Sequence, residues 1–154
     1  MNTSCPRCQG TLMERTTQKA VFEICSGCGG LLADRPEFTK FVNEMLDLVR
    51  SKIRLDHPPT TIEDQRPVMQ CIECSSTMER FGYLESRHVT LDRCTPCEIL
   101  FVDGDEIEAV IRLAARTKLR EEEQMAQRDE LAAHLASLVN ATLIGRGYAS
   151  LATP

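Results

Sequence analysis

Two stretches near the start of the chain decide the fold: Cys5-Pro6-Arg7-Cys8 and Cys25-Ser26-Gly27-Cys28-Gly29-Gly30. Each contains a C-x2-C pair, and sixteen residues separate the two pairs. Two cysteines three positions apart in a tight turn can direct both sulfurs toward one metal ion, and a second such turn completes a tetrahedron. The residues between the pairs suffice for a β-hairpin, with short strands expected at 11–15 and 20–24. This spacing is typical of a zinc ribbon.

The same pattern occurs a second time. Four further cysteines follow as two C-x2-C pairs separated by nineteen residues, and no cysteine is left over: Cys71, Cys74, Cys94 and Cys97. Strands are expected at 78–83 and 88–91. The repeat predicts a small metal-bound α+β protein with two tandem ribbons and one Zn²⁺ in each, two per chain. Because four thiolates fill the shell of each ion, we expect the zinc to be structural.

Other uses of the cysteines are less favoured. Disulfides need an oxidising compartment, and residues 1–10 lack the apolar stretch of an export signal, which favours a cytoplasmic protein. A thioredoxin-like redox site needs a single C-x2-C in a βαβ unit. An iron–sulfur centre also takes four thiolates, and the spacing alone does not exclude it. The three histidines, His57, His88 and His134, are not needed as ligands.

An acidic pair follows each ribbon at the same distance, Asp34 with Glu37 and Asp103 with Glu106. Since an apolar stripe at helical spacing begins after each pair, we interpret the pairs as helix caps and not as catalytic carboxylates. The first stripe is Phe38, Phe41, Val42, Met45, Leu48, Val49 and Ile53, and the second is Ile107, Val110, Ile111, Ala114 and Ala115. A third follows the polar run 120–124 and consists of Leu131, Leu135, Leu138, Val139 and Thr142.

These features predict a division of the chain. The expected parts are a ribbon with its helix at 1–56, a proline-rich linker at 57–67, a second ribbon with its helix at 68–118, a C-terminal helix at 119–146 and a tail at 147–154. A ribbon is too small to bury a helical stripe, so we expect the helices to pack on one another, within the chain or in a homo-oligomer. No apolar run is long enough to span a membrane.

The first ribbon resembles the transcription factor IIB-type zinc ribbons of small bacterial and archaeal proteins. Cys5-Pro6-Arg7-Cys8, the Cys25 to Gly30 stretch, Asp34 and Glu37 carry the resemblance over about residues 3–45, and the second unit is similar over 69–112. The sequence departs from that family at five positions: Leu32 and Phe101 replace its tryptophan, and Ile72, Glu98 and Ile99 replace a proline and two glycines. The ligands are unchanged. The resemblance implies a zinc scaffold with a role in transcription, in nucleic-acid binding or in protein contact.

Composition bears on the function. The chain has 154 residues, a net charge of −5, and only five Phe, two Tyr and no Trp. Its charge opposes general binding to polyanions, and no nucleophile and base are paired, so we expect a non-enzymatic module that binds a protein partner. The alternative is a nucleic-acid-binding regulator that uses basic and aromatic side chains of the hairpins. Those side chains are Arg80, Phe81, Tyr83, Arg87, His88 and Arg93 in the second ribbon, and Arg7, Arg15 and Lys19 in the first.

Overall fold

The computed structural model describes residues 4–49 and 66–145. The chain forms two compact units, residues 1–116 and residues 117–154. The first unit contains both ribbons. Most of the predicted linker, His57, Ile53 and the tail at 147–154 lie outside the described residues.

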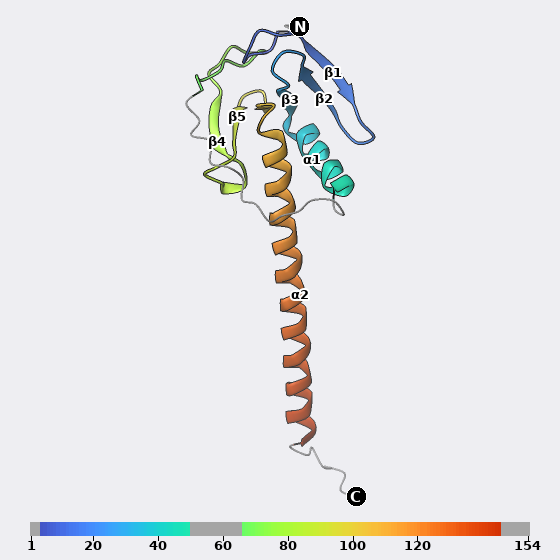
Figure 1. Cartoon of the computed structure of the whole chain (residues 1–154). Coiled ribbons are helices and arrows are strands. Elements are labelled where there is room, and N and C mark those ends of the chain that lie inside the picture. The colour runs from blue at the N-terminus through green and yellow to red at the C-terminus, as the bar shows by residue number, and fades with distance from the viewer. Residues whose placement is uncertain (1–3, 50–65, 146–154) are drawn as a thin grey trace, which may run out of the picture. The chain divides into compact units, whose positions relative to one another are not determined.

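Within residues 4–49 and 66–116, six strands form one sheet with the order β1-β2-β3-β6-β5-β4. Each ribbon contributes an antiparallel hairpin and a third strand: β1 Leu12–Thr16, β2 Val21–Cys25 and β3 Leu31–Asp34, then β4 Glu79–Gly82, β5 Thr90–Cys94 and β6 Ile99–Val102. Figure 1 shows the first three strands in blue and β4 and β5 in green and yellow. The hairpin strands lie within three residues of the positions expected between the cysteine pairs, and β5 differs most, since 88–91 was expected. Strands β3 and β6 were not predicted.

The two ribbons meet through β3 and β6, which pair antiparallel at the centre of the sheet. Leu32 lies opposite Phe101, and these two residues occupy the same position in the two repeats. Leu31 lies opposite Val102, the counterpart of Ala33 in the second repeat, and Ala33 lies opposite Leu100, the counterpart of Leu31. Reciprocal pairing of this kind is that of a twofold-symmetric interface. The sequence predicted two separate ribbon units, and the structure instead joins them into one pseudo-symmetric sheet.

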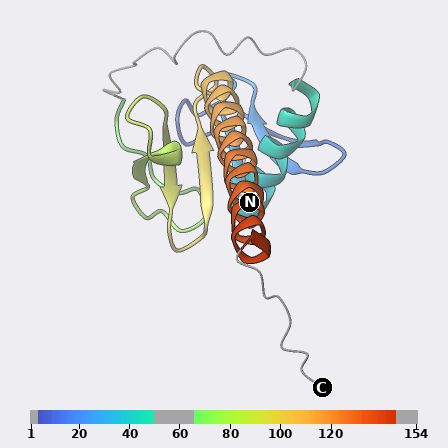
Figure 2. The same cartoon turned by 90° about the horizontal axis from the view of Figure 1, so that it is seen from below.

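Helices pack on one face of this sheet. Helix α1, Arg35–Val49, buries Phe38, Phe41 and Val42, and the first turns of α2, Ile107–Gly145, bury Val110 and Ala114. These residues form one cluster with alternate side chains of the strands: Ala20, Phe22, Leu31, Ala33, Val89, Leu91, Leu100 and Val102. The apolar residues of α1 and of the first turns of α2 therefore pack on a sheet that both ribbons form together (Figures 1 and 2). Neither ribbon alone could supply this surface.

The opposite face carries the cysteine turns. Its buried cluster contains four of the cysteines, Cys5, Cys25, Cys71 and Cys94, together with Leu12, Leu32, Met69, Met78 and Phe101. Phe101 is fully buried, and a side chain at Gly30 would overlap its ring, since a Cβ atom there would lie 2.4 Å from Cζ. The metal-binding turns and the helices thus lie on opposite sides of the shared strands β3 and β6.

Helix α2 differs from the prediction at its middle. The sequence predicted a helix after the second ribbon and a separate helix at 119–146, but one continuous helix runs from Ile107 to Gly145. The run Arg120-Glu121-Glu122-Glu123-Gln124 is polar without being a break, because these residue types have high helix propensity. From residue 119 to residue 142 the helix is exposed on all sides, including Leu131, Leu135, Leu138 and Val139. Among the described residues, no helix is both long enough and apolar enough to cross a membrane.

Candidate metal centres and the surfaces around them

The eight cysteines form two groups of four, as predicted. Within each group the sulfur atoms all lie within 4.8 Å of one another: Cys5, Cys8, Cys25 and Cys28 in the first, and Cys71, Cys74, Cys94 and Cys97 in the second. The Sγ–Sγ distance is 3.7 Å between Cys5 and Cys28 and 3.4 Å between Cys8 and Cys25. In the second group Cys74 and Cys94 are 3.5 Å apart. A tetrahedron of four sulfurs around zinc, with bonds of about 2.3 Å, has edges of about 3.8 Å. Both groups therefore fit a zinc ion with four thiolate ligands.

The backbone turns hold the sulfurs in this arrangement. The residue after the second cysteine of every C-x2-C pair has a positive φ: 63° at Gln9, 70° at Gly29, 58° at Ser75 and 56° at Glu98. This left-handed residue closes the turn, as the bond from the Gln9 amide to the Cys5 carbonyl oxygen shows. The turn also directs amides at sulfur: Arg7 N–H donates to Cys5 Sγ at 3.4 Å and Gly27 N–H to Cys25 Sγ at 3.3 Å. Amides aimed at a sulfur favour the thiolate that a metal requires.

The clustered thiols affect one another's protonation. Burial alone would raise the pKa of Cys25, but the amides of Cys28 and Gly27 and the adjoining thiols lower it to about 6, whereas burial raises the pKa of Cys28 to about 12. In the second group, hydrogen bonds from Ser76 lower the pKa of Cys74 to about 6, and the Cys74 sulfur raises that of Cys97 to about 12. Thiols this close cannot all ionise on their own. A dication between them removes the conflict.

A buried ionic cluster joins the two ribbons. Arg7 lies in the first cysteine turn, and its side chain is only 10 % exposed because it reaches into the second ribbon. Its guanidinium donates two hydrogen bonds of 2.9 Å to Asp103 and one of 2.8 Å to Asp92. Arg80 donates to the other oxygen of Asp92 at 3.1 Å, and Arg66 pairs with Asp103 at 2.8 Å. Arg7 and Arg80 were candidate nucleic-acid contacts in the sequence, but both are ion-paired within the protein.

The two acidic pairs behave differently. Asp34 caps α1 as predicted, because its Oδ1 accepts from the Glu37 amide at 2.8 Å. Glu37 does not complete the predicted capping box: it accepts from the amide of Val21 and pairs with Lys40. The prediction for Asp103 as a cap was wrong, since its buried carboxylate serves the arginines and only its backbone oxygen accepts from Glu106. An acidic residue before a helix fits either role, so the sequence could not distinguish them.

The remaining predicted contacts of the second hairpin are also partly occupied. Arg93 pairs with Glu79 at 2.7 Å and lies 4.8 Å from the centre of the Phe81 ring. Phe81 and Tyr83 are half-buried and pack against the core, where Tyr83 meets Phe38 edge to face. The exposed members of the set are Arg87 and His88, and His134 is exposed on α2. No histidine lies in either group of metal ligands within the described residues.

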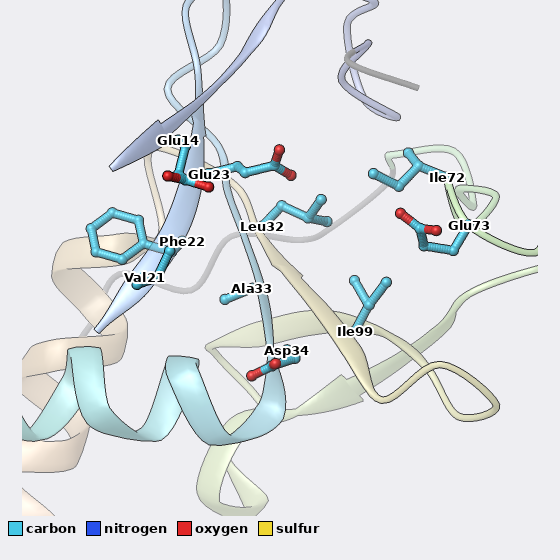
Figure 3. A pocket seen from close by; sticks show the side chains of 10 residues that line it. All are labelled: Glu14, Val21, Phe22, Glu23, Leu32, Ala33, Asp34, Ile72, Glu73 and Ile99. Carbon is cyan, nitrogen blue, oxygen red and sulfur yellow. The ribbon is translucent and has the colours of Figure 1, made fainter. Parts of the chain in front are cut away.

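A groove of about 240 Å³ lies on the face of the sheet that carries the cysteine turns (Figure 3). Ten residues of both ribbons line it: Glu14, Val21, Phe22, Glu23, Leu32, Ala33, Asp34, Ile72, Glu73 and Ile99. Figure 3 shows Leu32 between the acidic side chains of Glu14 and Glu23 on β1 and β2 and that of Glu73, in the turn that opens the second ribbon. Burial raises the pKa of Glu23, and the charges of Glu14 and Glu73 raise it further. The sequence patterns did not predict this groove.

Comparison with known proteins identifies part of the chain. Residues 4–44 match the family model of a TFIIB-type zinc ribbon described as a transcription factor zinc-finger. That match covers the first ribbon and the start of α1, and the second four-cysteine group at 71–97 lies beyond it. No curated protein and no solved structure matches the chain. The first ribbon is thus a zinc-binding module of the TFIIB type, and the second four-cysteine group likewise fits a zinc ion.

Proposed function

We propose that the protein is a non-enzymatic, zinc-stabilised module that binds a protein partner in a transcription-related process. One observation carries the proposal: each metal centre has four thiolates, which leave no ligand position open for a substrate or a catalytic water. A metal with a full shell contributes folding energy, on the order of 10–16 kcal/mol for a structural zinc. The function then belongs to the surface that the two ions hold in place. The proposal includes a cytoplasmic location, because thiolate ligands stay reduced in that compartment.

The family match supports the transcription part of the proposal, and the charges support a protein partner. Each Zn²⁺ with four thiolates adds a net charge of −2 to a chain that already carries −5. Binding to a nucleic acid needs arginines and lysines that are free to meet phosphates. Arg7, Arg80 and Arg93, three of the cations that the sequence offered for this purpose, are ion-paired to carboxylates. Nucleic-acid binding is therefore the less favoured function.

We also propose that the exposed stripe of α2 binds a second copy of the chain. Leu131, Leu135, Leu138 and Thr142 follow the alternating four-and-three spacing of a coiled-coil seam. The three leucines are 51–58 % exposed. An identical helix packed against a stripe with this spacing buries its apolar side chains in a coiled-coil interface.

Capture from cells of the native source tests the partner class. We expect the tagged full chain to retain a protein that survives nuclease treatment, and a Cys74→Ser variant to lose it because one ribbon no longer folds. Recovery of nucleic acid, with binding to DNA or RNA that weakens steeply as salt rises, would contradict the proposal. A Ser75→Ala variant is the matched control, since the residue lies in the same turn and is no ligand.

Light scattering tests the second copy. The full chain is expected to have the mass of a dimer, and a chain that ends at residue 118 that of a monomer. Leu135→Glu should have the same effect in the full chain, whereas Glu130→Gln on the same helix should leave the dimer intact. A full chain that is monomeric at high concentration rules out this role for α2.

A further inference from the structure

The buried ionic cluster has a counterpart in the other half of the sheet. Arg80 lies opposite Asp92 on β4 and β5, and at the same register of β1 and β2 Glu14 lies opposite Glu23. Arg7 is the third residue of the first cysteine turn, and Glu73 is the third residue of the turn that opens the second ribbon. Asp34, the last residue of β3, and Asp103, the residue after β6, occupy equivalent positions in the two repeats. The twofold relation therefore places Glu14, Glu23, Asp34 and Glu73 where the other site has Arg80, Asp92, Asp103 and Arg7.

The two sites differ in charge. In the first, Arg7 is bound to both Asp92 and Asp103, Arg80 is bound to Asp92, and Arg66 also pairs with Asp103. In the second, both arginine positions carry glutamate, and none of the ten residues that line the groove is basic. Carboxylates directly opposite on paired strands, as Glu14 and Glu23 are, repel each other. Asp92 and Asp103 hold the guanidinium of Arg7. Their counterparts, Glu23 and Asp34, line a groove that has no basic side chain among its lining residues.

The second site is also hollow and partly apolar. Its volume of about 240 Å³ corresponds to about eight water molecules at ~30 Å³ each. An arginine side chain has seven non-hydrogen atoms, so a space of this size can hold one. The hydrocarbon stem of an arginine packs well on apolar side chains, and Leu32, Ile72 and Ile99 offer that surface.

We propose that this groove binds an arginine side chain of a partner protein, in the place that corresponds to Arg7 in the other half. The inference rests on the proposed function as a protein-binding module and names the chemistry of its partner. A guanidinium suits the site better than an ammonium because its planar fork can meet two carboxylates at once. A nucleic acid does not suit it, since four carboxylates repel phosphates.

An NMR titration of the zinc-loaded full chain tests the proposal. The probe is the peptide acetyl-Ile-Arg-Leu-amide, and its matched control replaces arginine by citrulline, which has nearly the same shape without the charge. We expect the arginine peptide to shift the amide signals of Glu14, Glu23, Leu32, Glu73 and Ile99. Binding of the citrulline peptide should be at least tenfold weaker. Equal binding of the two peptides, or no shift from either, overturns the proposal.

A charge-reversal variant locates the site. Glu73→Arg places a guanidinium at the counterpart of Arg7, where it meets Glu23 and Asp34 from within the chain, and should weaken the arginine peptide at least tenfold. Glu121→Arg makes the same charge change on the exposed part of α2 and should leave the affinity unchanged. Glu23→Gln should also weaken binding and serves if Glu73→Arg does not fold. Unchanged affinity in a folded Glu73→Arg chain overturns the assignment.

Two further results separate the alternatives. If Mg²⁺ or Ca²⁺ shifts the groove signals and excludes the arginine peptide at equal concentration, the groove is a cation site and the proposal is wrong. If Glu73→Arg captures the same cellular partner as the natural chain, the groove is not where that partner binds, although the proposed function stands. If the partner is lost in Cys74→Ser but retained in Glu73→Arg, it binds the folded module at a surface other than the groove.

Discussion

The contact between Gly30 and Phe101 gives the sharpest test of the pseudo-symmetric sheet. The counterparts of these residues are Ile99 and Leu32, so a small and a large residue in one half correspond to two medium ones in the other. A Cβ atom at position 30 would lie 2.4 Å from Phe101 Cζ and 3.1 Å from both Cε atoms. The ring is fully buried and cannot turn away into solvent. Gly30→Ala should therefore destabilise the chain by about 1–3 kcal/mol, the usual effect of overpacking a core.

A second substitution should reverse part of this loss. Phe101→Leu shortens the ring to the residue present at the counterpart, Leu32, and by itself leaves a cavity that costs about 1–2 kcal/mol. In the double variant the new methyl group enters the space that the ring vacated. We expect the double variant to be more stable than the sum of the two single effects by about 1–2 kcal/mol.

Urea denaturation at a fixed concentration of free zinc measures these differences. Zinc content should stay at two ions per chain in every variant, since neither position is a ligand. Thr95→Ala, an exposed change in a cysteine turn, is the control and should be neutral. A neutral Gly30→Ala, or effects that simply add in the double variant, would refute the proposed packing of β3 against β6.

Three other outcomes follow from single residues. Arg7→Met should lower the free energy of unfolding, measured in urea, by about 3 kcal/mol, because it leaves two buried carboxylates short of a partner. A double variant that also replaces Asp103 by Asn should lose less stability than the two single variants added together. Glu98→Gly should raise the thermal midpoint through a gain of about 0.5–1 kcal/mol, since Glu98 has a φ of 56° that glycine adopts freely; a lower midpoint contradicts this. Hydrogen bonds from Thr17 and two amides hold the pKa of Glu44 below its ordinary 4.5. The ionised carboxylate therefore stabilises the fold above pH 4.5, and this stabilisation is lost as the pH falls through the lowered pKa. Urea midpoints of Glu44→Gln and the natural chain should differ by a constant amount from pH 7 down to about pH 5, and the difference should shrink only below 4.5.

The metal centres were predictable from the sequence because their information is local. Cysteine spacing determines which sulfurs can meet, and the length of chain between the pairs predicts the hairpins. The capping role of Asp34 depends on neighbouring residues only and was confirmed. The stripe of α1 was confirmed in its first part, where Phe38, Phe41 and Val42 are buried. Further along the helix Leu48 is 61 % exposed and Leu46, which was not predicted, is buried instead.

The sheet that joins the ribbons depends on residues far apart in sequence. Strands β3 and β6 are short apolar runs that resemble the start of the helical stripes, so periodicity alone does not distinguish them. The role of Arg7 follows from the same pairing, since its partners Asp92 and Asp103 come within reach only when the ribbons share a sheet. One signal was available in the repeat itself: the third residue of the opening cysteine turn is Arg7 in one copy and Glu73 in the other. A reversal of charge at equivalent positions indicates that the two copies have different neighbours.

Covalent duplication explains how such a difference can exist. Two identical ribbons related by a twofold axis would carry two identical sites, both filled by arginine or both acidic. In a single chain the two sites can differ, and here one is closed by Arg7 while the other remains a groove. The closed site ties the ribbons together from within, so the open one does not need to contribute to their association. Asp34 also caps α1, whereas neutral side chains in place of Glu14, Glu23 and Glu73 would remove the repulsion between carboxylates. Their retention in a groove with an apolar floor is accounted for by a cationic ligand that comes from another molecule.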